Sequence, residues 1–289
     1  MRAALSAPSG VRSPVVLVLI GILSVQLGAG IAKTLFDEAS PTTLVWLRLL
    51  CSAVVLLLLA RPRLRGRSRA DWAVVVGFGL SLGLMNWSIY QAFARIPLGM
   101  AVTIEFAGPL LLAVLGSRRP RDLLWVALAG AGVLLLGLEP GGLDLAGAAY
   151  ALLAGACWAA YILLSRSTGA RWEGLEGLAT ASLIAVVALA PLQLAGYAAE
   201  LLSWHVMLLG ALVGVLSSVI PYSCELIALR SLRPAVFGIL MSLEPAAAAL
   251  VGFLVLSETL SLPQWAALVC VVAASIGATR RNPAAPAPD

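Results

Sequence analysis

Charge is scarce in this chain, and so are the side chains that most often carry enzyme or metal chemistry. Only 11% of the 289 residues are charged, histidine occurs once, and the four cysteines show no Cys-x-x-Cys spacing. His205 follows Trp204, a pairing more typical of a membrane interface than of a ligand site. These absences argue against a soluble domain, a disulfide framework and a zinc site. Because no Ser/His or Asp/Asp cluster stands out either, we expect no enzyme activity and no cofactor.

Apolar residues dominate the composition instead. They make up 61% of the chain, and the mean hydropathy is +0.99, as in a membrane protein. Apolar runs long enough to cross about 30 Å of hydrocarbon as helices recur along the whole chain. The first run resembles a signal peptide in its flanking arginines, but it is long enough to span, and we interpret it as a retained helix. The sequence thus predicts an all-α membrane protein with ten transmembrane helices, over residues 14–32, 41–60, 71–93, 98–116, 122–138, 144–165, 174–195, 204–229, 234–256 and 261–279.

The basic residues alternate between the predicted connecting segments. Most of them fall at the N-terminus, in every second loop and at the C-terminus, with five arginines in "RPRLRGRSR" alone. The other loops carry acidic residues such as Asp37 and Glu38, and Lys33 and Arg95 are the basic exceptions. By the positive-inside rule, both termini are predicted to be cytoplasmic. Arginines that face the anionic leaflet of the lipid bilayer explain the net charge of +5 without a nucleic-acid partner.

The sequence contains an internal repeat. Residues 92–109 and 228–245 align without a gap, and both end in a proline in the middle of a predicted helix, Pro109 and Pro245. Two repeats of five helices must have opposite orientations in the membrane, because five is an odd number. Inverted repeats are typical of secondary transporters, although channels also contain them. We predict a first five-helix repeat over residues 1–143, an inverted second one over 144–280 and a disordered tail over 281–289.

Two segments carry a resemblance to a known family. "SSVIPYSCELIALRSLRPAVFGILMSLEP", followed by "LSETLS", resembles the second repeat of the EamA-type drug/metabolite transporters, in particular the threonine/homoserine exporter branch. "QAFARIPLGMAVTIEFAGP" resembles the corresponding segment of their first repeat. The resemblance implies a multi-pass exporter of amino acids or similar small metabolites in the bacterial inner membrane, driven by protons through antiport. An uncoupled facilitator or channel and an importer are the alternatives, and the protein is either a monomer or a homodimer.

Charged residues within the predicted spans are candidates for function. They are Arg48, Glu105, Glu225 and Glu244. A full charge near the bilayer centre costs about 2.5–3.5 kcal/mol or more, so each is expected to face a cavity, a partner or water. We expect Glu105, Glu244 and Arg48 to bind protons or substrate; the alternative is a static pair of Glu105 with Arg48 and a structural role for Glu244. Glu225 is a candidate gate or anchor that pairs with Arg230 or Arg233.

Neutral residues complete the predicted site. Asn86 and Tyr90 share one face of a predicted helix, and Tyr222 follows a proline in another. They are candidates to line a pocket for a polar substrate, with packing as the alternative. Pro109 and Pro245 each remove a backbone hydrogen bond, which predicts a kink or gate at both positions.

Overall fold

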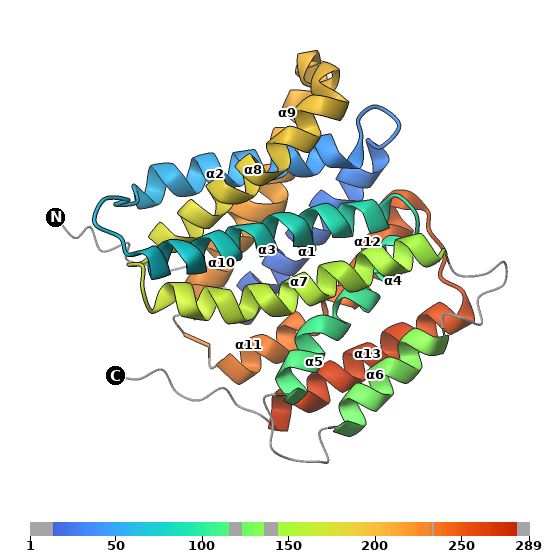
Figure 1. Ribbon diagram of the computed structural model, residues 1–289. Helices are drawn as coiled ribbons and strands as arrows, with labels where there is room; N and C mark the ends of the chain where they lie inside the picture. Colours follow the sequence, from blue (N-terminus) through green and yellow to red (C-terminus); the bar gives the residue numbers. More distant parts are fainter. Residues whose placement is uncertain (1–13, 116–122, 136–143, 230, 233, 282–289) are drawn as a thin grey trace.

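The computed structural model describes residues 14–115, 123–135, 144–229, 231–232 and 234–281, and every regular element within them is helical (Figure 1). The elements up to residue 135 are α1 (Pro14–Thr34), α2 (Pro41–Ala60), α3 (Arg69–Phe93), α4 (Leu98–Glu105), α5 (Ala107–Leu115) and α6 (Leu123–Leu135). The later elements are α7 (Leu145–Gly169), α8 (Glu176–Tyr197), the 3₁₀ turn η3 (Ala198–Leu202), α9 (Trp204–Gly214), the π-helical turn η4 (Val215–Val219), α10 (Ile220–Leu229), α11 (Pro234–Met241), α12 (Glu244–Leu256) and α13 (Leu262–Arg281).

Short polar residues set the starts of several long helices. Ser40 accepts a hydrogen bond from the Thr43 N–H and is followed by proline, a residue suited to the first helical position of α2. Ser68 and Asp71 form a reciprocal capping box at the start of α3. Asp144 accepts from the Gly147 N–H, 2.7 Å away, at the start of α7. These caps mark the start of each helix at the boundaries that the polar breaks in the sequence indicate.

Seven of the helices in the described part of the chain are long and apolar enough to cross a membrane. Large apolar side chains cover their outer surfaces, as expected where lipid replaces water; Leu58, Leu59 and Phe253 are each more than half exposed. The protein is a multi-pass membrane protein. Three further apolar helices, Leu98–Leu112, Leu123–Gly132 and Leu262–Ala278, are shorter. They coincide with the other expected spans, and the count of ten stays a prediction.

Two of the expected spans are each divided into two helices. α4 ends at Glu105 and α11 ends at Met241. These residues lie four positions before Pro109 and Pro245, and a proline has no N–H to donate to the carbonyl four residues earlier. The helix breaks therefore occur at matching positions of the two aligned segments. The interruption is one residue, Phe106, in the first half and two residues, Ser242 and Leu243, in the second.

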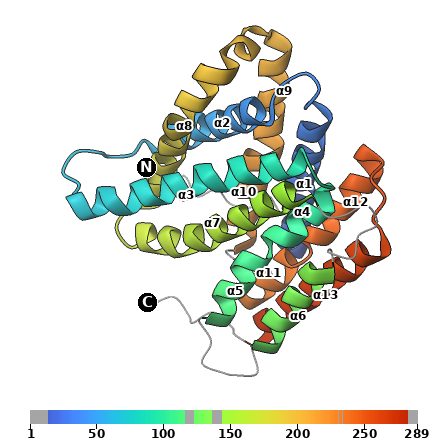
Figure 2. The same ribbon diagram turned by 45° about the vertical axis from the view of Figure 1, so that its right-hand side comes forward.

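The helices before and after residue 140 pack against each other in corresponding pairs. α3 lies along α7, and α1 lies along α10; likewise α5 contacts α7, and α12 contacts α1. α6 and α13 lie side by side at one edge of the molecule (Figures 1 and 2). Such matching pairs are what an approximate two-fold relation between the halves would produce. They support the inverted repeat and the boundaries predicted for it, which stay predictions.

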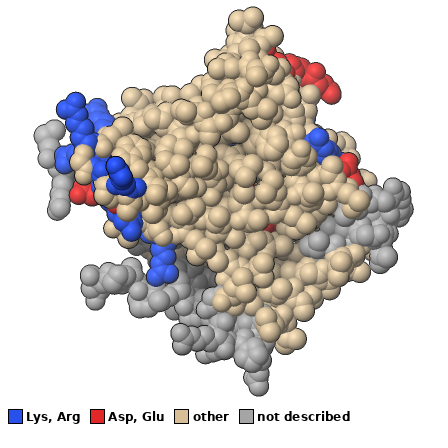
Figure 3. Space-filling view, in the orientation of Figure 1, with Lys and Arg blue, Asp and Glu red and all other residues tan. Residues whose placement is uncertain are grey.

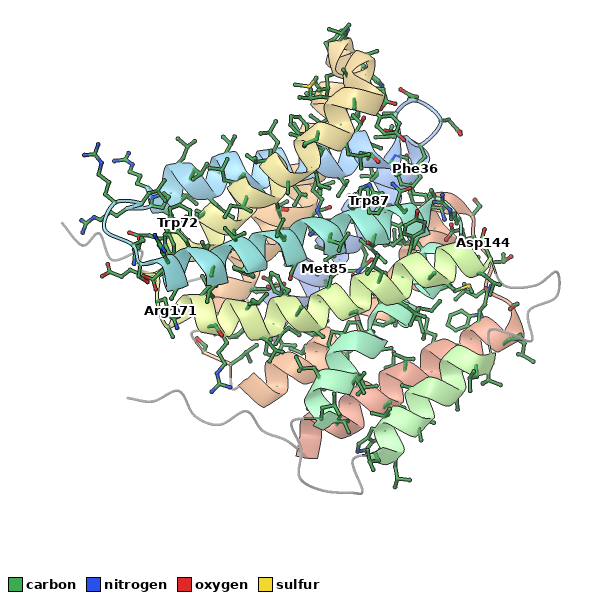
Figure 4. The ribbon with its side chains drawn as sticks, in the orientation of Figure 1. Phe36, Trp72, Met85, Trp87, Asp144 and Arg171 are labelled. Carbon is green, nitrogen blue, oxygen red and sulfur yellow. The ribbon has the colours of Figure 1, made fainter. Side chains whose placement is uncertain are left out.

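Charged side chains gather at the two ends of the bundle. In Figure 3, the largest group of basic side chains lies at the end that carries the α2–α3 link, where Arg67 donates to Glu176 over 2.6 Å. Trp72 and Arg171 lie at this end in Figure 4, whereas Phe36 and Asp144 lie at the other. The placement of the arginine-rich end in the cytoplasm stays a prediction. The tail expected over 281–289 lies outside the described residues, except that Arg281 ends α13.

Candidate functional site

A cavity of about 450 Å³ lies between the two sets of helices. Residues from α1 to α5 line it together with residues from α7, η4 and α10 to α13. Met85 on α3, labelled in Figure 4, marks its position beside α7. Most of the wall is apolar, and the polar or charged side chains on it are Gln26, Arg48, Asn86, Glu105, Ser217, Glu225, Glu244 and Ser275. Its volume lies in the range of small-molecule sites, which is about 300–1,000 Å³.

The helix breaks place two carboxyl groups on the cavity wall. Glu105 is the last residue of α4 and is only 9% exposed, while Glu244 is the first residue of α12. Both line the cavity, and Arg48 and Glu225 lie close enough to Glu244 to interact with it electrostatically. The cavity thus contains three carboxyl groups and one guanidinium among its described lining residues. Among the described ion pairs none joins Arg48 to Glu105, but the two lie close enough to interact electrostatically, so the static pair considered from the sequence stays an open alternative.

Arg48 is held in place by a backbone carbonyl and an aromatic ring. Its Nη2 donates to the Ser217 carbonyl over 3.3 Å, and its guanidinium carbon lies 5.7 Å from the centre of the Tyr90 ring. Tyr90 is fully buried and does not line the cavity. Tyr90 therefore packs against Arg48, and the pocket-lining role expected for it stays a prediction.

The other expected site residues are distributed as follows. Asn86 lines the cavity, and its Nδ2 donates to the Leu82 carbonyl of its own helix over 2.9 Å. Pro109 lines the cavity, whereas Pro245 is buried outside the lining. The side chain of Tyr222 lies outside the described part of the structure. Its backbone belongs to α10.

Glu225 occupies a position between two cavities. It lines the central cavity and also a smaller, mostly apolar pocket of about 240 Å³, which residues of α2, the α8 region and α10 form. Its expected partners, Arg230 and Arg233, lie outside the described residues, so the ion pair with either stays a prediction. The placement of Glu225 near the end of α10 shows that the central cavity extends toward the arginine-rich end of the molecule.

Sequence reasoning missed several lining residues. Gln26 and Ser217 are polar residues in apolar runs, and Trp158 and Tyr161 add aromatic surface. A neutral polar residue in a membrane helix is a weak signal, because it also bonds to its own backbone. Within the described residues, no group of His, Cys, Asp and Glu side chains is arranged to hold a metal ion.

Comparison with known proteins identifies the family. The model of the EamA-like transporter family matches the chain twice, over residues 12–138 and 145–280. The chain belongs to the EamA-like transporter family. A threonine/homoserine exporter RhtA from Salmonella typhimurium strain LT2 is 42% identical over 276 residues, with 93% of each chain covered. The protein of that name from Escherichia coli K12 is 41% identical over 269 residues, covering 92% of this chain and 91% of the relative.

A solved structure shares the fold of this EamA-like transporter. A protein of known crystal structure aligns with 93% of this chain over 99% of its own length, with a TM-score of 0.62 and 20% sequence identity. At that identity the likeness concerns the fold alone. It places this EamA-like transporter in an architecture that experiment has already observed.

Proposed function

We propose that this protein is a secondary active transporter that exports threonine, homoserine or closely similar amino acids across the bacterial inner membrane in exchange for protons. The two relatives named as threonine/homoserine exporters support the substrate class, because the identity of more than 40% extends over nearly the whole chain. The family supports transport in general. Proton coupling and alternating access rest on the cavity.

The charge balance of the cavity is the observation that carries the proposal. Glu105, Glu225 and Glu244 share the cavity with one described cation, Arg48. If all three carboxyl groups were ionised, two negative charges would have no counter-charge in a largely apolar space, which is costly. Protons must therefore neutralise the carboxyl groups that neither Arg48 nor an ammonium group of the substrate pairs with. A carboxyl group that can hold either a proton or an ammonium group can exchange one for the other.

An amino acid zwitterion suits this site. Its ammonium can pair with Glu105 or Glu244, and its carboxylate can pair with Arg48. The zwitterion adds no net charge, so the carboxyl groups that it does not pair with remain protonated. When the amino acid leaves, protons take the place of the ammonium at the carboxyl groups. Competition of substrate and proton for the same groups couples the two flows, because the empty and unprotonated cavity is the costly state.

The divided helices supply a route to alternating access. Glu105 and Glu244 lie where α4 meets α5 and where α11 meets α12, so each half contributes one break to the site. Broken helices near the midplane bind substrate in many secondary transporters, and the two segments move with their own halves. Movement of one half against the other would expose the same carboxyl groups first to one side of the membrane and then to the other.

Purified protein in sealed vesicles tests this function. A pH gradient is imposed across the vesicle membrane, and radiolabelled threonine or homoserine is followed with no amino acid gradient at the start. The proposal expects accumulation against the substrate gradient, with the direction set by the pH gradient and abolished by a protonophore. An uncoupled facilitator or channel would only equilibrate the amino acid, and that result contradicts the proposal.

A further inference from the structure

One corner of the cavity contains polar atoms that the structure leaves without partners. The corner is formed by Gln26 on α1, Arg48 on α2 and Ser217 on η4. Gln26 and Ser217 are each 3% exposed. The Gln26 Oε1, the Arg48 Nε and the Ser217 Oγ are all buried and have no hydrogen-bond partner. An unpaired buried polar group costs about 1–3 kcal/mol, so three of them in one place call for an explanation.

The backbone of η4 explains why Arg48 lies in this corner. In an α-helix, the Ser217 carbonyl would accept from the N–H four residues later, but that residue is Pro221, which has none. The Arg48 Nη2 donates to this carbonyl instead. One edge of the guanidinium is thereby fixed on η4, and its Nε is left without an acceptor. Single π-helical turns such as η4 are frequent at functional sites.

Contacts between α1 and η4 hold the two segments together beside the cavity that Gln26 and Ser217 both line. Ser24 donates to the Leu216 carbonyl over 2.7 Å. One turn further along the same face of α1, a Cβ atom added at Gly28 would collide with the Ser217 Oγ, so the two segments touch there with no room for a side chain. The backbone that carries Gln26 is therefore packed closely against the backbone that carries Ser217.

We propose that this corner binds the carboxylate of the transported amino acid. The Arg48 Nε–H and the Ser217 hydroxyl donate to the carboxylate oxygens, a charge-assisted arrangement. Gln26 carries a donor and an acceptor on one amide: its Nε2 donates to the carboxylate, and its Oε1 accepts from the neighbouring ammonium. The remaining side of the ammonium faces Glu105 and Glu244 across the same cavity. Gln26 and Ser217 thus recognise the part that all amino acids share.

The inference rests on the proposed function, because it assigns one end of that substrate to the corner. It makes a separate claim, however. The carboxyl groups account for charge balance and proton exchange, whereas the corner accounts for the preference for a carboxylate. A ligand that keeps the ammonium and the hydroxyl but lacks the carboxylate, such as threoninol, should lose the contacts that the corner makes with the carboxylate and keep the other contacts.

The experiment compares Gln26→Leu and Ser217→Ala with the wild-type protein in vesicles. Hydrogen bonds to charged groups contribute about 1.5–3 kcal/mol, which corresponds to a rise of roughly tenfold to 100-fold in the half-saturating threonine concentration. Threoninol loses only the contact of its ammonium with Gln26 in Gln26→Leu and no carboxylate contact in either variant, so its inhibition should weaken less than threonine transport does, and the preference for threonine over threoninol should shrink. Ser88→Ala is the matched control, because the Ser88 Oγ is also buried and unpaired but does not line the cavity. It should leave both values unchanged.

Thermal denaturation of the detergent-solubilised protein gives a second readout. Threonine should raise the denaturation temperature of wild type and Ser88→Ala by more than threoninol does, and this difference should disappear in both corner variants. The proposal is overturned if wild type exports threonine while Gln26→Leu and Ser217→Ala keep the wild-type half-saturation and preference. If wild type moves no amino acid at all and no amino acid stabilises it, the proposed function itself fails. The two failures are therefore distinguishable.

Discussion

The Lys33 Nζ and the Glu258 Oε1 lie 2.7 Å apart and join α1 to the link between α12 and α13. The other carboxylate oxygen of Glu258 accepts from the Leu98 N–H over 2.8 Å, and Lys33 also donates to the Ile96 carbonyl over 2.7 Å. The three segments are thus tied together at the end of the bundle away from the arginine-rich link. None of these residues lines the central cavity, which extends toward the other end. We expect this arrangement to keep that end of the cavity closed.

Glu258→Gln should weaken this closure. Glutamine keeps an oxygen for the Leu98 N–H but removes the charge that Lys33 neutralises. Because the pair is mostly shielded from water, we expect a loss of about 1–3 kcal/mol, seen as a lower midpoint of thermal denaturation in detergent. Glu38→Gln is the control, since Glu38 and His205 form a half-exposed pair that contributes little. Equal midpoints for the two variants would show that the Lys33 pair does not stabilise the closed end.

Glu105→Gln should abolish export driven by a pH gradient. The substitution preserves the size of the side chain and removes the group that exchanges a proton for the ammonium, so the imposed gradient no longer drives accumulation. Transport in vesicles measures this, with Glu173→Gln as an exposed control that should keep wild-type activity. Full gradient-driven export by Glu105→Gln would mean that this carboxyl group is structural.

Tyr90→Phe should leave transport nearly unchanged, whereas Tyr90→Ala should not. The hydroxyl of Tyr90 has no hydrogen-bond partner, so its removal costs little, but the ring lies under the Arg48 guanidinium. Deleting the ring leaves a cavity, which costs about 3–5 kcal/mol for an aromatic side chain, and frees Arg48 to move. In Tyr90→Ala alone, the half-saturating threonine concentration should rise and the denaturation temperature should fall. A large defect in Tyr90→Phe would instead assign the hydroxyl a direct role.

Gly155→Ala should disturb the site through the backbone. A Cβ atom at Gly155 would lie 2.5 Å from the Glu105 carbonyl oxygen, so α7 would have to move away from the end of α4. Overpacking of this kind costs about 1–3 kcal/mol. We expect a lower denaturation temperature and slower export. Gly130→Ala is the matched control, because no atom lies within 4 Å of its added Cβ; a similar effect of both substitutions would point to helix propensity or lipid contact instead.

The sequence predicted the features that depend on local pattern. Apolar runs located the helices, and the aligned prolines located the breaks at Glu105 and Met241, since a missing N–H acts on a carbonyl only four residues away. Charges in apolar segments located Arg48, Glu105, Glu225 and Glu244, because the cost of burying a charge drives each toward a cavity. All four residues line the same cavity, which is what we expect if buried charged groups share polar surroundings.

The remaining features depend on packing between distant segments. Gln26 and Ser217 differ from ordinary polar residues of membrane helices only because the Gln26 Oε1 and the Ser217 Oγ have no hydrogen-bond partner. Their proximity depends on the packing of α1 against η4, two segments that lie far apart in the sequence. Tyr90 lies on the expected face of α3, but it is fully buried and packs against the guanidinium of Arg48, which lines the cavity. Periodicity identifies the face of a helix, and it does not identify which residue of that face touches a ligand.

Exchange of an amino acid for protons is the central claim, and one measurement tests it most directly. Vesicles containing the purified protein and a trapped pH-sensitive dye are given a threonine gradient with equal pH on both sides, while labelled threonine is counted in the same sample. The account predicts that threonine flux moves protons the opposite way, so the internal pH changes with the threonine gradient and does not change in Glu105→Gln. Threonine movement by the wild-type protein with no change of internal pH would contradict it.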